Sequence, residues 1–468
     1  MSDTPILFWF RRDFRLADHR GLSAAVATGR PVIPVFIHDE VVESHGAAPK
    51  WRLGLGAEVF DHALRGIGSR LVFRRGSALE VLRALVTETG AGAVYWSRAY
   101  DPQAVARDTA VKAGMTDDGI DAQSHVGHLL FEPWSVETKT GGFYKVYTPM
   151  WKAVRDRELP ECLPAVKALR APGIWPESEN IADWQMGREM QRGAAVVARH
   201  ARVGEAEARA RLETFIAEPV QDYATQRDIP SVRGTSGLSE NLTYGEISPL
   251  ACWHAGWQAL HEGKGDAEVF LKELVWREFA YHLVWHTPHI LTENWRREWD
   301  SFPWSEDDEA ALRWKQGRTG IQLVDAAMRE MYVTGTMHNR GRMIVASYLT
   351  KHMMTHWKVG RDWFEECLID WDPASNAMGW QWAAGSGPDA APYFRVFNPD
   401  TQAEKFDKTR EYRAKFIGEL FRHHGPEAKE YFAAIPESWG LSIDRPYPKP
   451  LVPLDVGRDR ALAAYKAR

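Results

Sequence analysis

The sequence predicts an α/β protein, in which an N-terminal doubly wound parallel sheet of Rossmann-like arrangement is joined by a long linker to an all-helical domain. Short apolar runs alternate with helical patterns at first, prolines and glycines then break regular structure, and only helical periodicity follows. A chain of 468 residues has room for two or three domains. We expect their boundaries at 1–130, 131–200 and 201–468.

The first 130 residues contain five strand candidates separated by helical stretches. The strands are expected at 6–10, 31–37, 70–74, 93–97 and 120–126. The helices between them are expected at 18–28, 50–68, 77–89 and 102–114. Because repeated β-then-α order produces parallel strands with crossover helices, a doubly wound sheet follows. No GxGxxG follows the first strand, so the usual dinucleotide fingerprint is absent here.

The rest of the chain changes character twice. Six prolines and a Gly-Gly pair interrupt residues 131–200, which is typical of a connector. Apolar residues then recur three and four positions apart, most clearly over 205–224, 266–286, 320–333, 340–358 and 361–369. No β-alternation is evident beyond residue 200, so an all-helical second domain is expected.

Composition and charge exclude several classes of protein. A protein that coats nucleic acid without reading its sequence is basic overall, whereas this chain has a formal net charge of −5. Contacts with DNA would therefore need a local basic patch. No run of about 18 apolar residues can cross a membrane, and the N-terminus is unlike a secretory signal. Three widely spaced cysteines argue against disulfides or a metal cluster, and they suit a cytoplasmic protein.

Residues 234–248, GTSGLSENLTYGEIS, place small and hydroxyl residues before a helix. Free backbone N–H groups and the hydroxyls of Thr235, Ser236 and Ser239 suit a pyrophosphate at a helix N-terminus. The alternative is a capped loop between domains.

One face of the helix expected at 272–286 carries Glu273, Trp276 and Arg277 at i, i+3 and i+4. An indole that stacks, a carboxylate that accepts from a base edge and a guanidinium that pairs with phosphate suit a base-reading surface. A solvated helix face is the alternative interpretation.

Residues 338–361 contain arginines and lysines but no Asp or Glu. Because the chain as a whole is acidic, DNA binding would need a local basic patch, and this stretch is the candidate for it. A solvated helix is the alternative. Three histidines lie in the same stretch, but no carboxylate or cysteine completes a ligand set, so no metal is expected.

Residues 368–399 bring Asp370, Asp372 and Asn376 before a Trp-Gln-Trp sequence. Paired carboxylates can do acid–base work, bind a metal, or hold a cation or a hydroxyl-rich cofactor. The pattern alone does not choose among these roles.

Together these blocks resemble the photolyase/cryptochrome flavoprotein family, most closely its bacterial members that repair cyclobutane pyrimidine dimers. The resemblance extends from FWFRRDFRLADHRGL (8–22) to PYFRVFNPDTQAEKFD (392–407). It implies an N-terminal antenna domain and a helical domain that binds one FAD in a U-shape. It also implies a cytoplasmic, monomeric lyase whose partner is UV-damaged DNA, in which light-excited FADH⁻ passes one electron to a flipped-out dimer and splits it into two pyrimidines.

By this resemblance the FAD phosphates lie at Tyr223 and along the run Thr235, Ser236, Gly237, Leu238 and Ser239. Relatives often carry Arg where Gly237 stands. Phe270, in place of a frequent Trp, lies on the adenine side. Asn376 faces flavin N5, where plant cryptochromes have Asp. The isoalloxazine is flanked by the remaining cofactor residues, Arg342, Asp370, Trp371 and Asp372.

The resemblance also assigns a pocket for the flipped dimer, made by Glu273, Trp276, Asn339, Met343 and Trp382. A dimer stacks and pairs poorly, so flipping it costs less than flipping normal bases. Glu273 and Asn339 would stabilise the developing radical anion. The (6-4) photolyases have His where Asn339 and Met343 stand. Phosphate clamps are expected at Arg227, Arg277, Arg340, Arg395 and Lys405.

Three tryptophans match the family's electron-transfer chain from flavin to surface, in the order Trp380, Trp357 and Trp314. Indoles are oxidisable and polarisable, so successive hops can supply electrons to the excited flavin. Core packing is the alternative role for any one of them.

The N-terminal domain is expected to hold a deazaflavin antenna rather than methenyl-folate, or else to have an empty antenna site. Folate-binding members have Asn-Glu where this chain has Gln103 and Ala104. The wall of the antenna site is expected along 46–56.

Two other functions compete with repair. One is a cryptochrome, a blue-light receptor without repair activity, and the other is a generic flavin electron-transfer protein. The dimer-pocket residues and the basic patch favour repair.

Overall fold

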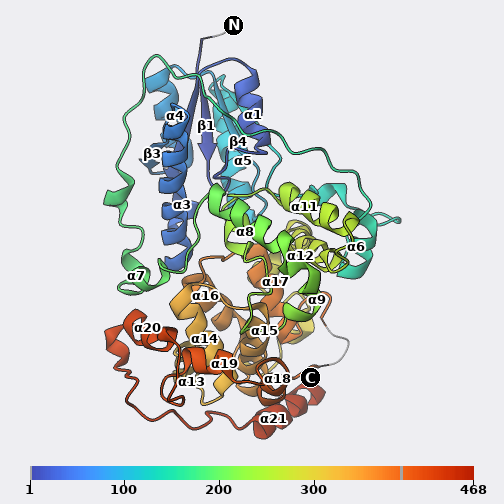
Figure 1. Ribbon diagram of the computed structural model, residues 1–468. Coiled ribbons are helices and arrows are strands. Elements are labelled where there is room, and N and C mark those ends of the chain that lie inside the picture. The colour runs from blue at the N-terminus through green and yellow to red at the C-terminus, as the bar shows by residue number, and fades with distance from the viewer. Residues whose placement is uncertain (1–2, 391–393, 468) are drawn as a thin grey trace.

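The computed structural model describes residues 3–390 and 394–467, so two residues of the 392–407 block lie outside the described part. An α/β domain stands on a larger helical domain (Figure 1). Its sheet is parallel, with the strand order β3-β2-β1-β4-β5. The strands are β1 (Ile6–Phe10), β2 (Val32–His38), β3 (Val72–Arg75), β4 (Ala93–Ser97) and β5 (Asp121–His125). The α/β prediction is confirmed, and the strand order reverses between β1 and β4.

Strand β1 shows why the sheet needs helices on both faces. Ile6, Phe8 and Phe10 pack into one core, whereas Leu7 and Trp9 pack into the other. Because alternate side chains of a strand point to opposite faces, a continuous apolar run is buried on both. Helices α1 (Arg20–Ala27) and α3 (Ala47–Gly66) cover the first face, and α4 (Ala78–Thr89) and α5 (Pro102–Asp117) cover the second.

The connector contains more structure than the sequence predicts. It includes the helices α6 (Tyr147–Val154) and α7 (Gly193–Val197). Between them the chain runs over the α/β domain (Figure 1), where Val32 N–H donates to the Arg170 carbonyl and Glu179 N–H donates to the Phe73 carbonyl. The linker is therefore packed against the domain that it leaves.

The second domain is helical throughout its described part, apart from one isolated bridge between Ser305 and Thr355. None of the described helices is long and apolar enough to cross a membrane. Helix α12 (Ala267–His286) lies at the centre and contacts α11 (Pro249–His261) and α17 (Pro373–Ala384). The other helices are α8 (Glu205–Ala217), α9 (Tyr223–Gln226), α10 (Ser239–Thr243), α13 (Glu309–Lys315), α14 (Gln322–Thr334), α15 (Asn339–Ser347), α16 (Trp357–Cys367), α18 (Pro399–Phe406), α19 (Glu411–Phe416), α20 (Pro426–Ala434) and α21 (Leu454–Ala467).

The prediction of a continuous helix over 340–358 is wrong. Helix α15 ends at Ser347, a π-helical turn follows over Tyr348–His352, and Met354 has a φ of +58°. Apolar spacing does not distinguish an α from a π turn, so the periodicity missed the break. The break allows α16 to start in a new direction at Trp357.

Candidate functional site

The loop before α10 presents free hydrogen-bond donors. Among the described residues, the backbone N–H groups of Thr235, Ser236 and Gly237 have no acceptor. Gly237 has a φ of +64°, a conformation that suits glycine. Three free N–H groups in one turn are suited to phosphate oxygens, so the loop fits the diphosphate of FAD.

Tyr223, expected at the FAD phosphates, and Phe270, expected on the adenine side, belong to the same buried cluster as Leu238 of this loop. Their ring centroids are 6.4 Å apart, and the ring of Phe215 lies 5.2 and 4.9 Å from them. Phe215 was not predicted, because a Phe inside an amphipathic helix is indistinguishable from any core residue.

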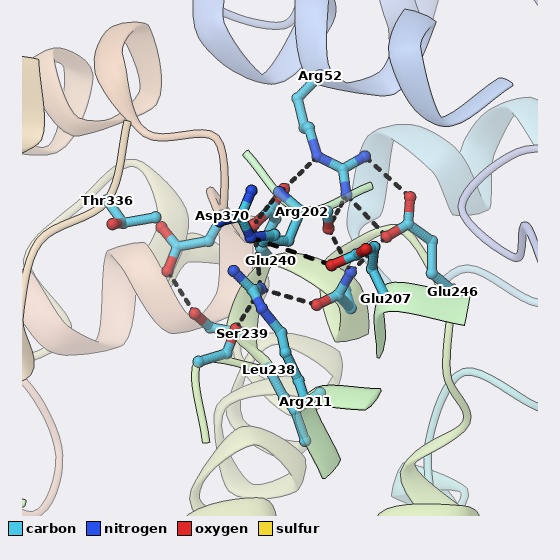
Figure 2. Close-up of polar contacts among 12 residues, drawn as sticks. Arg52, Arg202, Glu207, Arg211, Leu238, Ser239, Glu240, Glu246, Thr336 and Asp370 are labelled. Carbon is cyan, nitrogen blue, oxygen red and sulfur yellow. Dashed lines mark hydrogen bonds and ion pairs between the residues drawn. The ribbon is translucent and has the colours of Figure 1, made fainter. Parts of the chain in front are cut away.

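One hydrogen-bonded group joins three parts of the predicted flavin site. Arg342 Nη2 lies 2.7 Å from Asp370 Oδ2, and Ser239 Oγ donates to the same oxygen at 2.7 Å. Figure 2 shows Ser239 pointing at Asp370. The loop before α10, helix α15 and the segment before α17 therefore meet at the carboxylate of Asp370. This includes the ion pair of Arg342 with Asp370 that the resemblance implies.

Asp372 holds helix α17 rather than facing an open site. Its carboxylate caps the helix by accepting from Ser375 N–H at 2.8 Å and also accepts from the Tyr281 hydroxyl. Helix α17 in turn carries Asn376, whose Nδ2 donates to the Arg361 carbonyl at 3.0 Å. No described residue donates to its Oδ1, which is left for a ligand. The indole N–H groups of Trp371 and Trp380 are buried without a partner among the described residues.

The tryptophan chain differs from the prediction at its outer end. Trp314 is fully buried, and its ring lies 6.0 Å from that of Trp380, so it does not provide an exit to the surface. Trp357 is also buried and donates to Asn294. Half-buried Trp304 is linked to Trp357 through His356, at centroid distances of 5.3 and 5.6 Å. Trp304 is thus the indole that reaches solvent from Trp357.

The residues predicted for the dimer pocket lie on three helices, of which α12 and α15 both contact α17. Glu273 on α12 pairs with Arg227 at 2.5 Å. Burial lowers the pKa of Arg227, but Glu273 outweighs this effect and raises it. The other members lie partly or fully exposed, namely Trp276, Asn339, Met343 and Trp382.

Trp276 has a support that the sequence did not predict. Tyr147 of α6 stacks on its indole with centroids 3.7 Å apart and planes 5° from parallel. The Tyr147 hydroxyl donates to the Lys272 carbonyl at 2.7 Å, and the backbone N–H of Tyr147 donates to the Asp389 carboxylate at 3.2 Å. The connector helix therefore fixes one face of the predicted wedge.

The predicted DNA-facing cations are only partly at the surface. Arg340 and Lys405 flank the Phe406 ring at 4.3 and 4.9 Å, and Arg340 pairs with Asp228. Lys405 and Arg395 are exposed, whereas the side chain of Arg340 is only 14% exposed. Within the basic patch, Lys351 is buried against the Phe394 ring at 3.5 Å. Burial lowers the pKa of Lys351 well below its usual value, so the basic patch is smaller than predicted.

The Arg277 guanidinium, predicted to clamp a phosphate, is bonded inside the protein. Its side chain is only 13% exposed and donates to the His128 carbonyl at 2.9 Å and to Glu278 at 3.2 Å. Helical spacing correctly places Arg277 one turn from Glu273. It does not indicate that residues 128–131, where the first domain passes into the linker, cover this side of α12.

A cavity of about 560 Å³ lies at the carboxyl ends of β1 and β4, where the strand order reverses. Ligands of doubly wound sheets bind at this position. Gln103 and Ala104 line it, as expected, but of segment 46–56 only Leu53 does. Its wall carries more arginines than carboxylates, namely Arg11, Arg12, Arg98, Arg107 and Arg361 against Asp13, Asp101 and Glu365.

The fold and this site define a flavoprotein that binds FAD in its helical domain. Residues 6–170 match the family described as DNA photolyase, and residues 270–467 match the FAD binding domain of DNA photolyase. The chain therefore belongs to the photolyase/cryptochrome flavoprotein family, as its sequence motifs indicated.

Its relatives span its whole length. The deoxyribodipyrimidine photo-lyase of Agrobacterium fabrum is 42% identical, over 100% of this chain and 98% of its own. A bacterial class III photolyase from Agrobacterium tumefaciens has a TM-score of 0.91 and 41% identity, over 100% of this chain and 98% of its own. An archaeal photolyase from Sulfolobus tokodaii, solved with two FAD molecules, has a TM-score of 0.81 and 27% identity, over 99% and 100% of the two chains.

Proposed function

We propose that this protein is a light-dependent DNA-repair lyase that splits cyclobutane pyrimidine dimers. The observation that carries the proposal is that Ser239 and Arg342 both bond the Asp370 carboxylate, in the same helical domain that carries half-buried Glu273 and Trp276. A flavin site and a base-reading surface then belong to one helical domain. Relatives that match the full length of the chain are named photo-lyases.

When FAD is bound and reduced, its chemistry would be the light-driven electron transfer that splits the dimer, with the electron recovered afterwards. The protein holds the dimer, orients it and excludes water. Trp276 and Trp382 would bracket the flipped dimer, while Glu273 and Asn339 would hydrogen-bond its polar edges. The free oxygen of Asn376 is available to the flavin edge. Strand phosphates would lie against Arg227, Arg340, Arg395 and Lys405.

Repair accounts for residues that the competing functions leave unexplained. A generic electron-transfer flavoprotein has no need of an accessible Glu273 paired with a cation, or of an indole held by a stacked tyrosine. A cryptochrome without repair activity has no need of a dimer pocket. Asn376 also stands where plant cryptochromes carry Asp.

We propose that the cavity at the strand ends holds the antenna chromophore, a deazaflavin rather than methenyl-folate. A volume of about 560 Å³ is enough room for a planar tricycle, and the polar wall offers hydrogen-bond partners to it. The family further implies a monomer in the cytoplasm, and the unpaired Cys162, Cys252 and Cys367 suit that reducing compartment. Gel filtration with light scattering tests the monomer.

The deciding experiment is repair of a thymine-dimer oligonucleotide by the purified, chemically reduced protein in blue light and in darkness. We expect thymines to be restored in light only, and an undamaged oligonucleotide to remain unchanged. Binding of FAD without any repair in light would contradict the proposal and favour the cryptochrome.

A further inference from the structure

A fully buried arginine from the α/β domain reaches the helical domain beside the phosphate loop. Arg52 of α3 is 0% exposed. Its Nε donates to Glu240 at 2.6 Å, and its two Nη atoms donate to Glu246 at 2.9 and 2.7 Å. Figure 2 shows this guanidinium pointing at both carboxylates, which come from the chain that follows the loop.

The second oxygen of Glu240 faces another arginine, from helix α8. Arg211 Nη1 lies 3.2 Å from this oxygen and also donates to the Gly237 carbonyl at 2.6 Å and to Asn241 at 2.9 Å. Arg52 and Arg211 therefore both bond the Glu240 carboxylate, and Arg211 also holds the loop directly through the Gly237 carbonyl. The backbone N–H groups of Thr235, Ser236 and Gly237 take no part in these contacts and, within the described part of the chain, stay free for phosphate.

Gly237 lies directly against Arg211. A Cβ at this position would be in van der Waals contact with Cζ and Nε of Arg211, at 3.8 Å, and the positive φ of +64° favours glycine. The cation beside the loop comes from α8, and a second guanidinium at position 237 would lie against it and repel it.

Buried ion pairs of this kind are costly, and their usual benefit is to fix one geometry rather than to add stability. Burial by itself lowers the pKa of Arg52, but Glu246 and Glu240 outweigh it and raise the pKa above its usual value. Arg52 therefore stays charged. Removing one member leaves a charged partner buried without its counter-ion.

We propose that Arg211 and Arg52, joined by Glu240, are positioning residues for the FAD phosphate loop, so that the α/β domain is part of the flavin site whichever antenna chromophore it binds. The inference deepens the proposed function and rests on its cofactor. These residues hold the carbonyl side of the loop, and the aligned N–H groups bind the diphosphate.

The test measures the FAD dissociation constant of apoprotein reconstituted with FAD. Arg211→Gln should bind FAD at least about tenfold more weakly, because a charged hydrogen bond to the loop is lost. Arg211→Lys, which keeps the charge and one donor, should recover much of the affinity. The matched control is Arg209→Gln on the same helix, whose guanidinium pairs with Glu205 at 2.7 Å and does not contact the loop. It should bind as the wild type does.

A purely structural role makes the opposite prediction. It would lower the melting temperature of the apoprotein and leave FAD affinity unchanged, and that result would overturn the proposal, as would equal affinities of Arg211→Gln and Arg209→Gln. Arg52→Lys should likewise weaken FAD binding; if it does not fold, Arg211→Gln decides alone. A wild-type protein that binds no FAD would instead refute the proposed function, so the two failures are distinguishable.

Discussion

At the scale of single residues, the tryptophans show what the sequence could and could not predict. Trp380 and Trp357 were found by their positions in family motifs, and both are buried in the helical domain. Trp314 was predicted from the same match to the family's chain, but its burial removes it from the surface end. The polar run SEDDE that follows Trp304 was the available signal for exposure, because acidic residues are seldom buried.

Flavin photoreduction should therefore depend on Trp304 rather than on Trp314. We expect Trp380→Phe to abolish photoreduction of oxidised flavin and Trp304→Phe to slow it at least about tenfold, since phenylalanine is much harder to oxidise than an indole. Trp314→Phe, which keeps the core filled, is the matched control and should photoreduce normally. Flavin absorbance under blue light with an external thiol measures all three, and impaired photoreduction in Trp314→Phe alone would restore the predicted order.

The stacked pair on α6 and α12 makes a second prediction at this scale. Trp276→Ala should weaken binding of dimer-containing DNA by about 1–3 kcal/mol, the usual contribution of one base–aromatic stack. Tyr147→Leu should cause a smaller loss in the same direction, because the indole then lacks its support. FAD content should be unchanged in both variants. Gel-shift titration measures the affinity, and equal binding of damaged DNA by Trp276→Ala and the wild type would exclude the wedge.

At the scale of elements, local patterns predicted the position of each strand well, but they did not predict which strands lie next to each other in the sheet. Strands β1 and β4 start and end where their apolar runs do, because both of their faces are buried. The order of the sheet arises from contacts between distant segments, which no local pattern encodes. Helix α6 was missed because prolines and glycines on either side suggested a connector, and with it the sequence missed Tyr147.

Helix α15 carries several predicted site residues, and its first turn depends on a neutral histidine. His338 caps the helix by accepting Arg340 N–H on Nδ1 at 3.1 Å, which a protonated ring nitrogen cannot do. Burial lowers the pKa of His338 to about 4, from 6.5. The folded protein thus binds fewer protons than the unfolded chain between these values. The contribution of the neutral His338 cap to the free energy of unfolding is therefore fully present above pH 6.5, and it is lost as the pH falls towards 4.

His338→Asn should remove that pH dependence, since an Asn cap accepts the same N–H at every pH. Relative to the wild type, the variant should gain up to about 1.4 kcal/mol of unfolding free energy for each pH unit below 6.5. Urea unfolding at pH 7.5, 6.0 and 5.0 measures the difference. A constant difference at all three values would show that His338 is not the titrating group.

At the scale of the whole molecule, the two domains share both of the predicted chromophore sites. The cavity at the ends of β1 and β4 is closed from the helical domain by residues that include Arg361, Trp371 and Asn376. Motifs within either domain could not reveal this shared wall. Asn376 thus belongs to the predicted flavin site and also lines the predicted antenna cavity, which suits energy transfer between two chromophores.

Filling the cavity should therefore separate light harvesting from repair. Ala104 is buried in the cavity wall at the start of α5, and Ala104→Phe places a ring where an antenna would lie. We expect this variant to retain FAD and to repair dimers in near-UV light as the wild type does. It should lose the rise in repair yield that added deazaflavin produces at the wavelengths the deazaflavin absorbs. Val105→Phe, one residue further along α5 and not among the lining residues, is the control and should keep the rise. A rise that persists in Ala104→Phe would place the antenna elsewhere.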